Sequence, residues 1–432
     1  MANIEKRGNN YRIVVSSGYD INGKKIRKYK TVTKPDDVTE KKWEKEIQKI
    51  ALDFERDIEK GLYVDSNSNL KEYFDKWFEE YADKQLQPRT LESYHYELDS
   101  KILPALGHIK LNKLTPIKIL SFLNNLTEDG IRKDGKQGGY SDRIIKYQWQ
   151  ILSSALQQAV YWQIIPENPC KRVKPPKNIN NNNEQVTEKE IKFYDENQTL
   201  LLLDIVKDEP LKYQIAVNIA IFCGLRIGEM LGLTWNDIDF DNKTLNVNKS
   251  RSHTKEKGMF TKYPKNKSSV RKLNIPDVLV KQLQEYKIVQ NGEKASCGDS
   301  WSDEWDKTPW LLTKWNGEGM YYNTLTDWLF KTIKKYNNRI DNNEDIQEDE
   351  KASYKLPVIS FHKLRHTSAT LLIGQNTDIR TVSARLGHAQ TSTTLNIYVH
   401  GLNSLDLKAS NSLKTYLLII KILNLKKQNK II

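Results

Sequence analysis

One tract near the middle of the chain limits the folds available to it more than any other feature. Residues 171–185 read KRVKPPKNINNNNEQ, with two adjacent prolines and a run of asparagines. Such a tract buries almost no apolar surface and is typical of an extended linker. The chain has 432 residues, about three ordinary domain lengths, so we place a linker at 171–186 with folded domains on both sides.

The segment 1–62 predicts a small β-sheet backed by a helix. Residues 11–15 and 26–32 have strand character and flank Asn22-Gly23, a dipeptide favoured in tight hairpin turns. The first 34 residues carry nine basic side chains and two acidic ones, and a basic β-ribbon fits the major groove of DNA. We therefore predict a DNA-binding domain here, with a solvated charged hairpin as the alternative.

Two further domains are expected, which gives a multidomain α+β fold class. Residues 66–170 predict a compact helical domain, in which the aromatic stripe from Tyr73 to Tyr81 has helical spacing and is assigned to the core. Residues 187–402 predict a mostly helical domain with a small antiparallel sheet. In that domain the polar tract 334–355 is expected to be a long exposed loop, and residues 403–432 form a tail.

Composition narrows the classes of function. Hydrophobic residues make up 38% of the chain, the mean hydropathy is -0.68, and no stretch of roughly 18 apolar residues occurs. The N-terminus also lacks a signal-peptide pattern, so we expect a cytoplasmic protein with no membrane partner. Lysine and arginine number 68 against 55 acidic residues, a net charge of +13, which favours nucleic acid as partner over a merely basic soluble protein.

The three cysteines, Cys170, Cys223 and Cys297, stand far apart and form no CxxC pair. This spacing argues against a disulfide framework and against a thiolate zinc site. We predict no bound metal and no cofactor.

Four local signals in residues 187–402 carry the chemistry. In chain order they are GLRIGE at 224–229, YPKNK at 263–267, HKLRH at 362–366 and LGH at 386–388, which is followed ten residues later by Tyr398. His362 and Arg365 are three residues apart, so on a helix they share a face and can converge on one anion. Each signal is weak alone, since an ordinary exposed polar face also explains such a pair.

Taken together, these signals resemble the tyrosine recombinase family, and the match with phage-type and conjugative-transposon integrases is close. The order that carries the resemblance is Arg226, Lys265, His362-x-x-Arg365, His388 and Tyr398. The resemblance covers about residues 187–400 and is reinforced by AIFCGLRIGE at 220–229 and LGLTWNDID at 231–239. It implies an arm-type DNA-binding domain at 1–62, a core-binding SAM-like domain at 66–170 and a catalytic domain at 187–402.

These residue types suit transesterification at a phosphodiester. A tyrosine phenol, with an unperturbed pKa of about 10, is a poor nucleophile that needs a base and a phosphate made electrophilic by cations. Planar guanidinium groups match two nonbridging oxygens, so Arg226 and Arg365 are assigned to this role. Because no cluster of carboxylates with metal-ligand spacing surrounds them in the sequence, we predict a reaction that needs no metal ion.

The resemblance assigns the nucleophile and the general acid. Tyr398 attacks to form a 3′-phosphotyrosyl bond, which conserves the bond energy of the strand and removes the need for ATP. Lys265 protonates the leaving 5′-oxygen, and Lys267 is the alternative for this role.

The resemblance also assigns the supporting residues. His362 acts on the tyrosyl proton, and His388 hydrogen-bonds a phosphate oxygen. Glu229 is expected to brace Arg226 rather than to touch DNA, and His366 is expected to be structural.

Two further segments carry expectations of their own. Residues 249–272 hold nine basic side chains and one acidic one, which predicts a surface that grips DNA phosphates, with a solvated charged ribbon as the alternative. The apolar run at 413–425, LKTYLLIIKILNL, is too short to span a bilayer. It either docks on a neighbouring protomer, folds back on its own domain or forms a poorly packed tail.

These expectations favour a site-specific DNA recombinase, an integrase that integrates and excises a phage or another mobile element. A type IB topoisomerase-like enzyme is the alternative, and a non-enzymatic DNA-binding or capsid-associated protein is the third reading. The expected partners are double-stranded DNA at attachment sites and further copies of the chain in a tetramer, with an excisionase and a host DNA-bending protein as further candidates. The expected location is the cytoplasm of a bacterial host.

Overall fold

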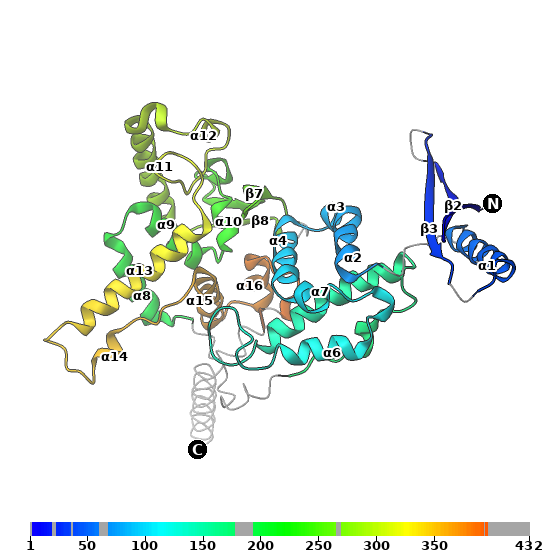
Figure 1. Ribbon diagram of the computed structural model, residues 1–432. Helices are drawn as coiled ribbons and strands as arrows, with labels where there is room; N and C mark the ends of the chain where they lie inside the picture. The colour runs from blue at the N-terminus through cyan, green and yellow to red at the C-terminus, as the bar shows by residue number, and fades with distance from the viewer. Residues whose placement is uncertain are drawn as a thin grey trace, which may run out of the picture. The chain divides into compact units, whose positions relative to one another are not determined.

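The computed structural model describes residues 2–19, 23–35, 38–59, 68–177, 193–264, 269–392 and 394–395. The chain divides into two compact units, Met1–Val186 and Thr187–Ile432, and Figure 1 traces their elements from the N-terminus to the C-terminus. Residues 178–186 of the predicted linker and the predicted tail 403–432 lie outside the described residues. The predicted fold class is confirmed, because helices dominate and the strands form small antiparallel sheets.

The first unit begins with a three-stranded antiparallel sheet covered by a helix. Strands β1 (Asn3–Arg7), β2 (Asn10–Tyr19) and β3 (Lys25–Thr33) pair in the order β1-β2-β3, and α1 (Glu40–Glu59) follows. Alternate residues of β2, Tyr11, Ile13 and Val15, are buried against Trp43 and Phe54 of α1. The hairpin of β2 and β3 is present as predicted, although Asn22 of its turn lies outside the described residues.

The sheet also contains a third strand, β1, which sequence reasoning missed and which pairs along β2. This strand reads NIEKR and lacks a clear apolar alternation. Its place in the sheet comes from backbone pairing with β2, from Asn3 opposite Val14 to Arg7 opposite Asn10.

The rest of the first unit is helical. Its α-helices are α2 (Leu70–Trp77), α3 (Asp83–Gln85), α4 (Pro88–Glu97), α5 (Leu103–Leu106), α6 (Pro116–Asn125) and α7 (Asp142–Tyr161), with π-helical turns at Phe78–Ala82 and Leu98–Ile102. Tyr73, Phe74 and Trp77 of the aromatic stripe are buried, and Tyr81 packs against them. The assignment of the stripe to the core is therefore confirmed.

The second unit combines helices with a three-stranded sheet and a hairpin. Strands β4 (Ile238–Asp239), β5 (Thr244–Val247) and β8 (Arg271–Asn274) pair in the order β4-β5-β8, while β6 (Ser250–Thr254) pairs with β7 (Gly258–Lys262). The helices are α8 (Glu196–Ile205), α9 (Leu211–Phe222), α10 (Ile227–Leu231), α11 (Asp277–Cys297), α12 (Glu304–Lys307), α13 (Tyr322–Asp341), α14 (Lys351–Tyr354), α15 (Phe361–Gly374) and α16 (Ile379–Leu386).

Helix α9 forms the centre of the core of the second unit. Its residues Ile215, Val217 and Ile219 are fully buried, as expected for a helix that is apolar on every side. Helix α15 packs against α9 and α16, so the turn from α9 to α10 lies beside both of them. None of the described helices combines the length and apolar character needed to cross a membrane.

The prediction of a loop at 334–355 was wrong at both ends, because α13 continues to Asp341 and α14 covers Lys351–Tyr354. Thr332 and Ile333 are buried on the inner side of α13. The side chain of Asn337 accepts a hydrogen bond from the Leu356 N–H at 3.0 Å and donates one to the Leu356 carbonyl at 2.8 Å. Polar residues of the tract thus hold the helix to the segment that follows.

Candidate active site

A sharp turn between α9 and α10 places Arg226 at the start of α10. Gly224 adopts a φ of +62°, a left-handed conformation that side chains rarely take. A Cβ atom at this position would lie 2.5 Å from Cδ2 of Leu386. Glycine therefore serves two purposes here, since it allows the turn and lets α16 approach it closely.

Arg226 is held by one carboxylate and one backbone carbonyl. Its guanidinium donates to Oε1 of Glu229 at 2.7 Å and to the carbonyl of Gly387 at 3.2 Å, and its backbone N–H donates to Oε2 of Glu229 at 3.0 Å. The Arg226 side chain remains 41% exposed. The predicted contact between Glu229 and Arg226 is present, and it leaves part of the guanidinium accessible to a ligand.

Arg365, on α15, lies beneath this contact and is 1% exposed. Its guanidinium donates to the carbonyls of Gly224 and Leu386, each at 2.6 Å, and lies 4.0 Å from Oε2 of Glu229. Burial lowers the pKa of Arg365 to about 9, and the nearby charge of Arg226 acts in the same direction. The group stays positively charged at neutral pH.

The histidines of the predicted site lie around these arginines. Burial lowers the pKa of His388 to about 4, with the charges of Arg365 and Arg226 acting in the same direction. Nδ1 of His388 lies 2.8 Å from the hydroxyl of Thr394. Burial and the charge of Arg365 also lower the pKa of His362. Both imidazoles are therefore neutral at physiological pH.

His366 stands one turn after His362 on α15, and their rings meet edge to face with centroids 4.7 Å apart. Burial lowers the pKa of His366 to about 4. Its Nδ1 atom is buried and has no hydrogen-bond partner among the described residues. The predicted structural role for His366 agrees with this packing against His362.

The structure thus brings together Arg226, Arg365 and His388, with His362 on the same helix as Arg365. Three of the residues predicted from the sequence lie outside the described residues: the two lysines, Lys265 and Lys267, and the tyrosine, Tyr398.

Sequence reasoning missed the role of Arg271, which begins β8. Its side chain is 7% exposed and donates to Oε2 of Glu229 at 2.9 Å, to the carbonyl of Arg385 at 2.7 Å and to the carbonyl of Ser269 at 3.2 Å. Arg271 therefore links Glu229 to α16 and to the residues just after 265–268. The signal for this was the strand period of two, which puts position 271 on the same side as the buried Leu273.

Glu229 is the one carboxylate that the structure pairs with this arginine cluster in the described part of the chain. Burial alone raises its pKa, but the hydrogen bonds and charges of Arg271 and Arg226 outweigh that effect, so the net pKa is lowered. Glu229 is therefore ionised at neutral pH and holds Arg226 and Arg271 in place.

Three of the nine cations of the predicted phosphate-binding surface at 249–272 are engaged within the unit. Arg271 points into the cluster just described, and Lys249 pairs with the buried Asp237 at 2.5 Å. Arg251 is 8% exposed and stacks on the ring of Trp310 at 4.1 Å. Each of these three cations contacts a carboxylate or an aromatic ring from another part of the chain. All three therefore stabilise the interior of the unit.

Comparisons with known proteins agree with this geometry. The Phage integrase family model matches residues 192–404, and the model for the N-terminal SAM-like domain of phage integrases matches residues 69–127. A protein named Tyrosine recombinase XerC-like, from Caldanaerobacter subterraneus subsp. tengcongensis, is 30% identical over 405 residues, which cover 90% of this chain and 92% of the relative. The chain belongs to the tyrosine recombinase family.

Two further comparisons place it within that family. The ICEBs1 integrase of Bacillus subtilis is 25% identical over 397 residues, which cover 90% of this chain and 93% of the relative. The solved structure of the Tn1549 transposon integrase in complex with transposon right end DNA shares the fold, with a TM-score of 0.58 and 20% identity over 76% of this chain and 94% of that one. The protein is an integrase of the phage or transposon type, and these comparisons give no support to the topoisomerase alternative.

Proposed function

We propose that this integrase cuts and rejoins duplex DNA through a 3′-phosphotyrosyl intermediate, with Tyr398 as the nucleophile. The observation that carries the proposal is the convergence of Arg226 and Arg365 on the carbonyls of two consecutive residues, Gly387 and Leu386. Two guanidinium groups anchored on one turn suit the binding of a single phosphodiester. The next residue in the chain, His388, is then in reach of the same phosphate.

The balance of charge in the cluster supports phosphoryl chemistry. Three guanidinium groups, those of Arg226, Arg271 and Arg365, share the carboxylate of Glu229. The surplus positive charge favours a bound phosphodiester, and it favours still more the transition state in which negative charge builds on the nonbridging oxygens. Arg226 reaches the phosphate from the accessible side, while Arg365 forms the floor of the site.

The neutral histidines suit proton transfer and hydrogen bonding. His362 takes the proton of the Tyr398 phenol, as a neutral imidazole can. When Nδ1 of His388 accepts from the hydroxyl of Thr394, its Nε2 carries the proton and donates to a phosphate oxygen. Lys265 protonates the leaving 5′-oxygen, with Lys267 as the alternative.

The proposed domains are the arm-type domain 1–62, the core-binding domain 66–170 and the catalytic domain 187–402, joined by the linker 171–186. In the arm-type domain, Arg12 stacks over the ring of Tyr29 at 4.0 Å on the sheet face opposite the buried Ile13. This open face suits insertion into the major groove.

The proposed partners are duplex DNA at attachment sites and other copies of the chain in a tetramer. The Tn1549 integrase was solved in complex with DNA, and the lambda integrase as a dimer bound to a core site, which supports DNA binding and assembly on DNA. An excisionase and a host DNA-bending protein are proposed as additional partners, and the run 413–425 as a contact between protomers.

The test uses a suicide substrate that carries the attachment site of the element. The wild-type protein should form a covalent protein–DNA adduct, and Tyr398→Phe should bind the same DNA and form none. An adduct at normal yield from Tyr398→Phe would refute the nucleophile assignment. Supercoiled plasmids with and without a cognate pair of sites then separate recombination, which needs the pair, from simple relaxation.

A further inference from the structure

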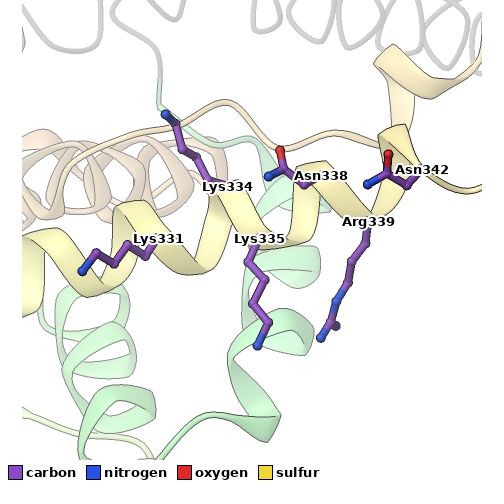
Figure 2. A pocket seen from close by; sticks show the side chains of 6 residues that line it. All are labelled: Lys331, Lys334, Lys335, Asn338, Arg339 and Asn342. Atoms are coloured by element: carbon purple, nitrogen blue, oxygen red, sulfur yellow. The ribbon is translucent and has the colours of Figure 1, made fainter.

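Helix α13 carries a strongly basic outer face on its C-terminal half. The residues that line it are all exposed and recur three or four positions apart: Lys331, Lys334, Lys335, Asn338, Arg339 and Asn342. Figure 2 shows these side chains on one helix. They line a shallow hollow of about 550 Å³. We call this set the α13 basic face. Every member offers at least one N–H donor, and four of them are cations.

The cations of the α13 basic face have no acidic partners within the part of the chain that the structure describes. Neither an ion pair nor a carboxylate hydrogen bond joins Lys331, Lys335 or Arg339 to any described residue, and Lys334 lies over the ring of Phe330 at 4.5 Å. Carboxylates are nevertheless close in sequence, because residues 341–350 hold six of them. Two of these pair with Lys351 and Lys355 instead.

The spacing of the cations has a cost for the isolated helix. Lys331, Lys335 and Arg339 follow each other at intervals of four, and like charges at that spacing repel across the helix surface. An anion bound along the face removes this repulsion. The face from Lys331 to Asn342 extends over about 16 Å, which is enough for contacts with several successive phosphates.

From this arrangement we infer that the α13 basic face binds the phosphate backbone of duplex DNA as a contact separate from the Arg226 and Arg365 site. The inference rests on the proposed function only in taking duplex DNA as the partner. In Figure 1 the C-terminal half of α13 runs toward α14 and away from α10 and α16. A duplex bound at the α13 basic face is therefore held by a different surface from the one that holds the reacting phosphate.

The composition of the face favours DNA over an acidic protein surface. Lysine is depleted at protein interfaces, whereas lysine, arginine and asparagine are common donors to phosphate oxygens. The acidic run 341–350 of a second copy is also a poor partner, since Asp341 and Glu348 already pair within their own chain.

The test is a salt titration of DNA binding with the full-length protein. A fluorescein-labelled duplex of about 40 base pairs is bound by Tyr398→Phe protein, which excludes the covalent step, at a series of NaCl concentrations. Adding Lys331→Gln, Lys335→Gln and Arg339→Gln should make the slope of log K against log [NaCl] shallower by between about 1 and about 3, because each lost phosphate contact removes about 0.9.

A matched control removes three charges from other exposed lysines of the same unit. Lys207→Gln, Lys281→Gln and Lys307→Gln change the net charge equally but lie on three different helical segments, so they should keep the parental slope. Thermal unfolding checks that both triple variants fold, and the α13 variant should be at least as stable as its parent because the repulsion is gone.

The outcomes distinguish this inference from the proposed function. An unchanged slope in the α13 variant would overturn the inference while leaving adduct formation by the wild-type Tyr398 protein untouched. An unchanged slope with a loss of self-association would overturn it in favour of a contact between copies. Failure of the wild-type protein to form an adduct would instead count against the proposed function, and the slope comparison would still stand.

Discussion

Arg226 and Arg365, which come from different helices, donate hydrogen bonds to the carbonyls of two consecutive residues, at 3.2 Å to Gly387 and at 2.6 Å to Leu386. The two arginines are 139 positions apart in sequence, yet one turn of backbone fixes both guanidinium groups. The same turn leads directly into His388. The relative positions of these three side chains therefore depend on the end of α16 as much as on their own helices.

The first prediction concerns Arg271 as a positioning residue. Arg271→Gln should lower the single-turnover rate of adduct formation by about 10²-fold, because the turn at 385–388 and Glu229 shift without its hydrogen bonds. DNA affinity should change little, since the side chain is buried. Rates and affinities are measured separately, by quenched adduct assays and by fluorescence anisotropy.

A neighbouring residue gives the control for Arg271. Lys272→Gln changes a side chain of the same strand that is 61% exposed and forms an ion pair with Asp239 at 3.7 Å. It should retain the wild-type rate of adduct formation. Arg271→Lys should restore part of the rate, since it keeps the charge facing Glu229. Equal rates for Arg271→Gln and Lys272→Gln would exclude the positioning role.

The second prediction compares two glycines with nearly the same φ angle. Gly224 has a φ of +62° and Gly258 a φ of +60°, but a Cβ would meet Leu386 at the first and nothing within 4 Å at the second. Gly258→Ala should cost about 1 kcal/mol of unfolding free energy from backbone strain alone. Gly224→Ala should cost a further 1–3 kcal/mol or so from overpacking and should slow adduct formation. Urea denaturation measures both costs, and equal values would contradict the close packing of α16 on the turn.

The third prediction concerns pH. The folded-state pKa of His366 is about 4, whereas an unfolded histidine titrates at about 6.5. Between these values the unfolded chain binds a proton that the folded chain does not, so the free energy of unfolding falls as the pH drops from about 6.5 toward about 4. His366→Phe should lose less stability than the wild type between about pH 7 and about pH 5 in urea titrations. Parallel losses in both proteins would show that other groups cause the effect.

The fourth prediction separates the two lysines proposed as general acid. Lys265→Ala should cleave normal DNA slowly and should be rescued by a 5′-bridging phosphorothiolate, whose sulfur leaves without protonation. Lys267→Ala provides the matched control and should show no selective rescue. If the rescue followed Lys267→Ala instead, the general acid would be reassigned to that residue.

The fifth prediction concerns metal ions. The charge that develops at phosphorus is met by Arg226 and Arg365 in the proposed mechanism, so strand joining should continue in the presence of excess chelator. The assay follows joined product with and without the chelator, and with added Mg²⁺ in a third reaction. A loss of joining that Mg²⁺ restores would assign part of the charge stabilisation to a metal.

Much of the fold was predictable because its signals are local. The aromatic residues of α2 follow helical spacing and α9 contains a continuous apolar run, each within a single segment, and both form core. The part of α13 from Lys334 to Asp341 was not recognised as helical, because these residues are mostly polar and none of them is a buried apolar side chain. A polar helix of this kind is stabilised by hydrogen bonds such as the one from Asn337 to the Leu356 carbonyl. A local sequence pattern does not predict such a bond, because the two residues are far apart in the chain.

In the candidate site, too, the residues of local motifs were predictable from the sequence, whereas contacts between distant segments were not. The motif spacing identified Arg226, Arg365 and His388, and the structure brings these side chains to one turn. Whether Arg271 faces DNA or the interior depends on Glu229, which lies 42 residues away and reaches it only in the folded unit. Charge counting along residues 249–272 therefore overestimated the surface available to DNA.

The arginine cluster around Glu229 has one more consequence. Guanidinium groups that contact only the sugar–phosphate strand meet a part that every DNA shares, so these contacts carry no information about the order of the bases. A centre built from them will act on whatever phosphate is delivered to it. Fidelity in choosing where to break the strand must then be imposed from outside the centre, by whichever parts of the chain read the grooves.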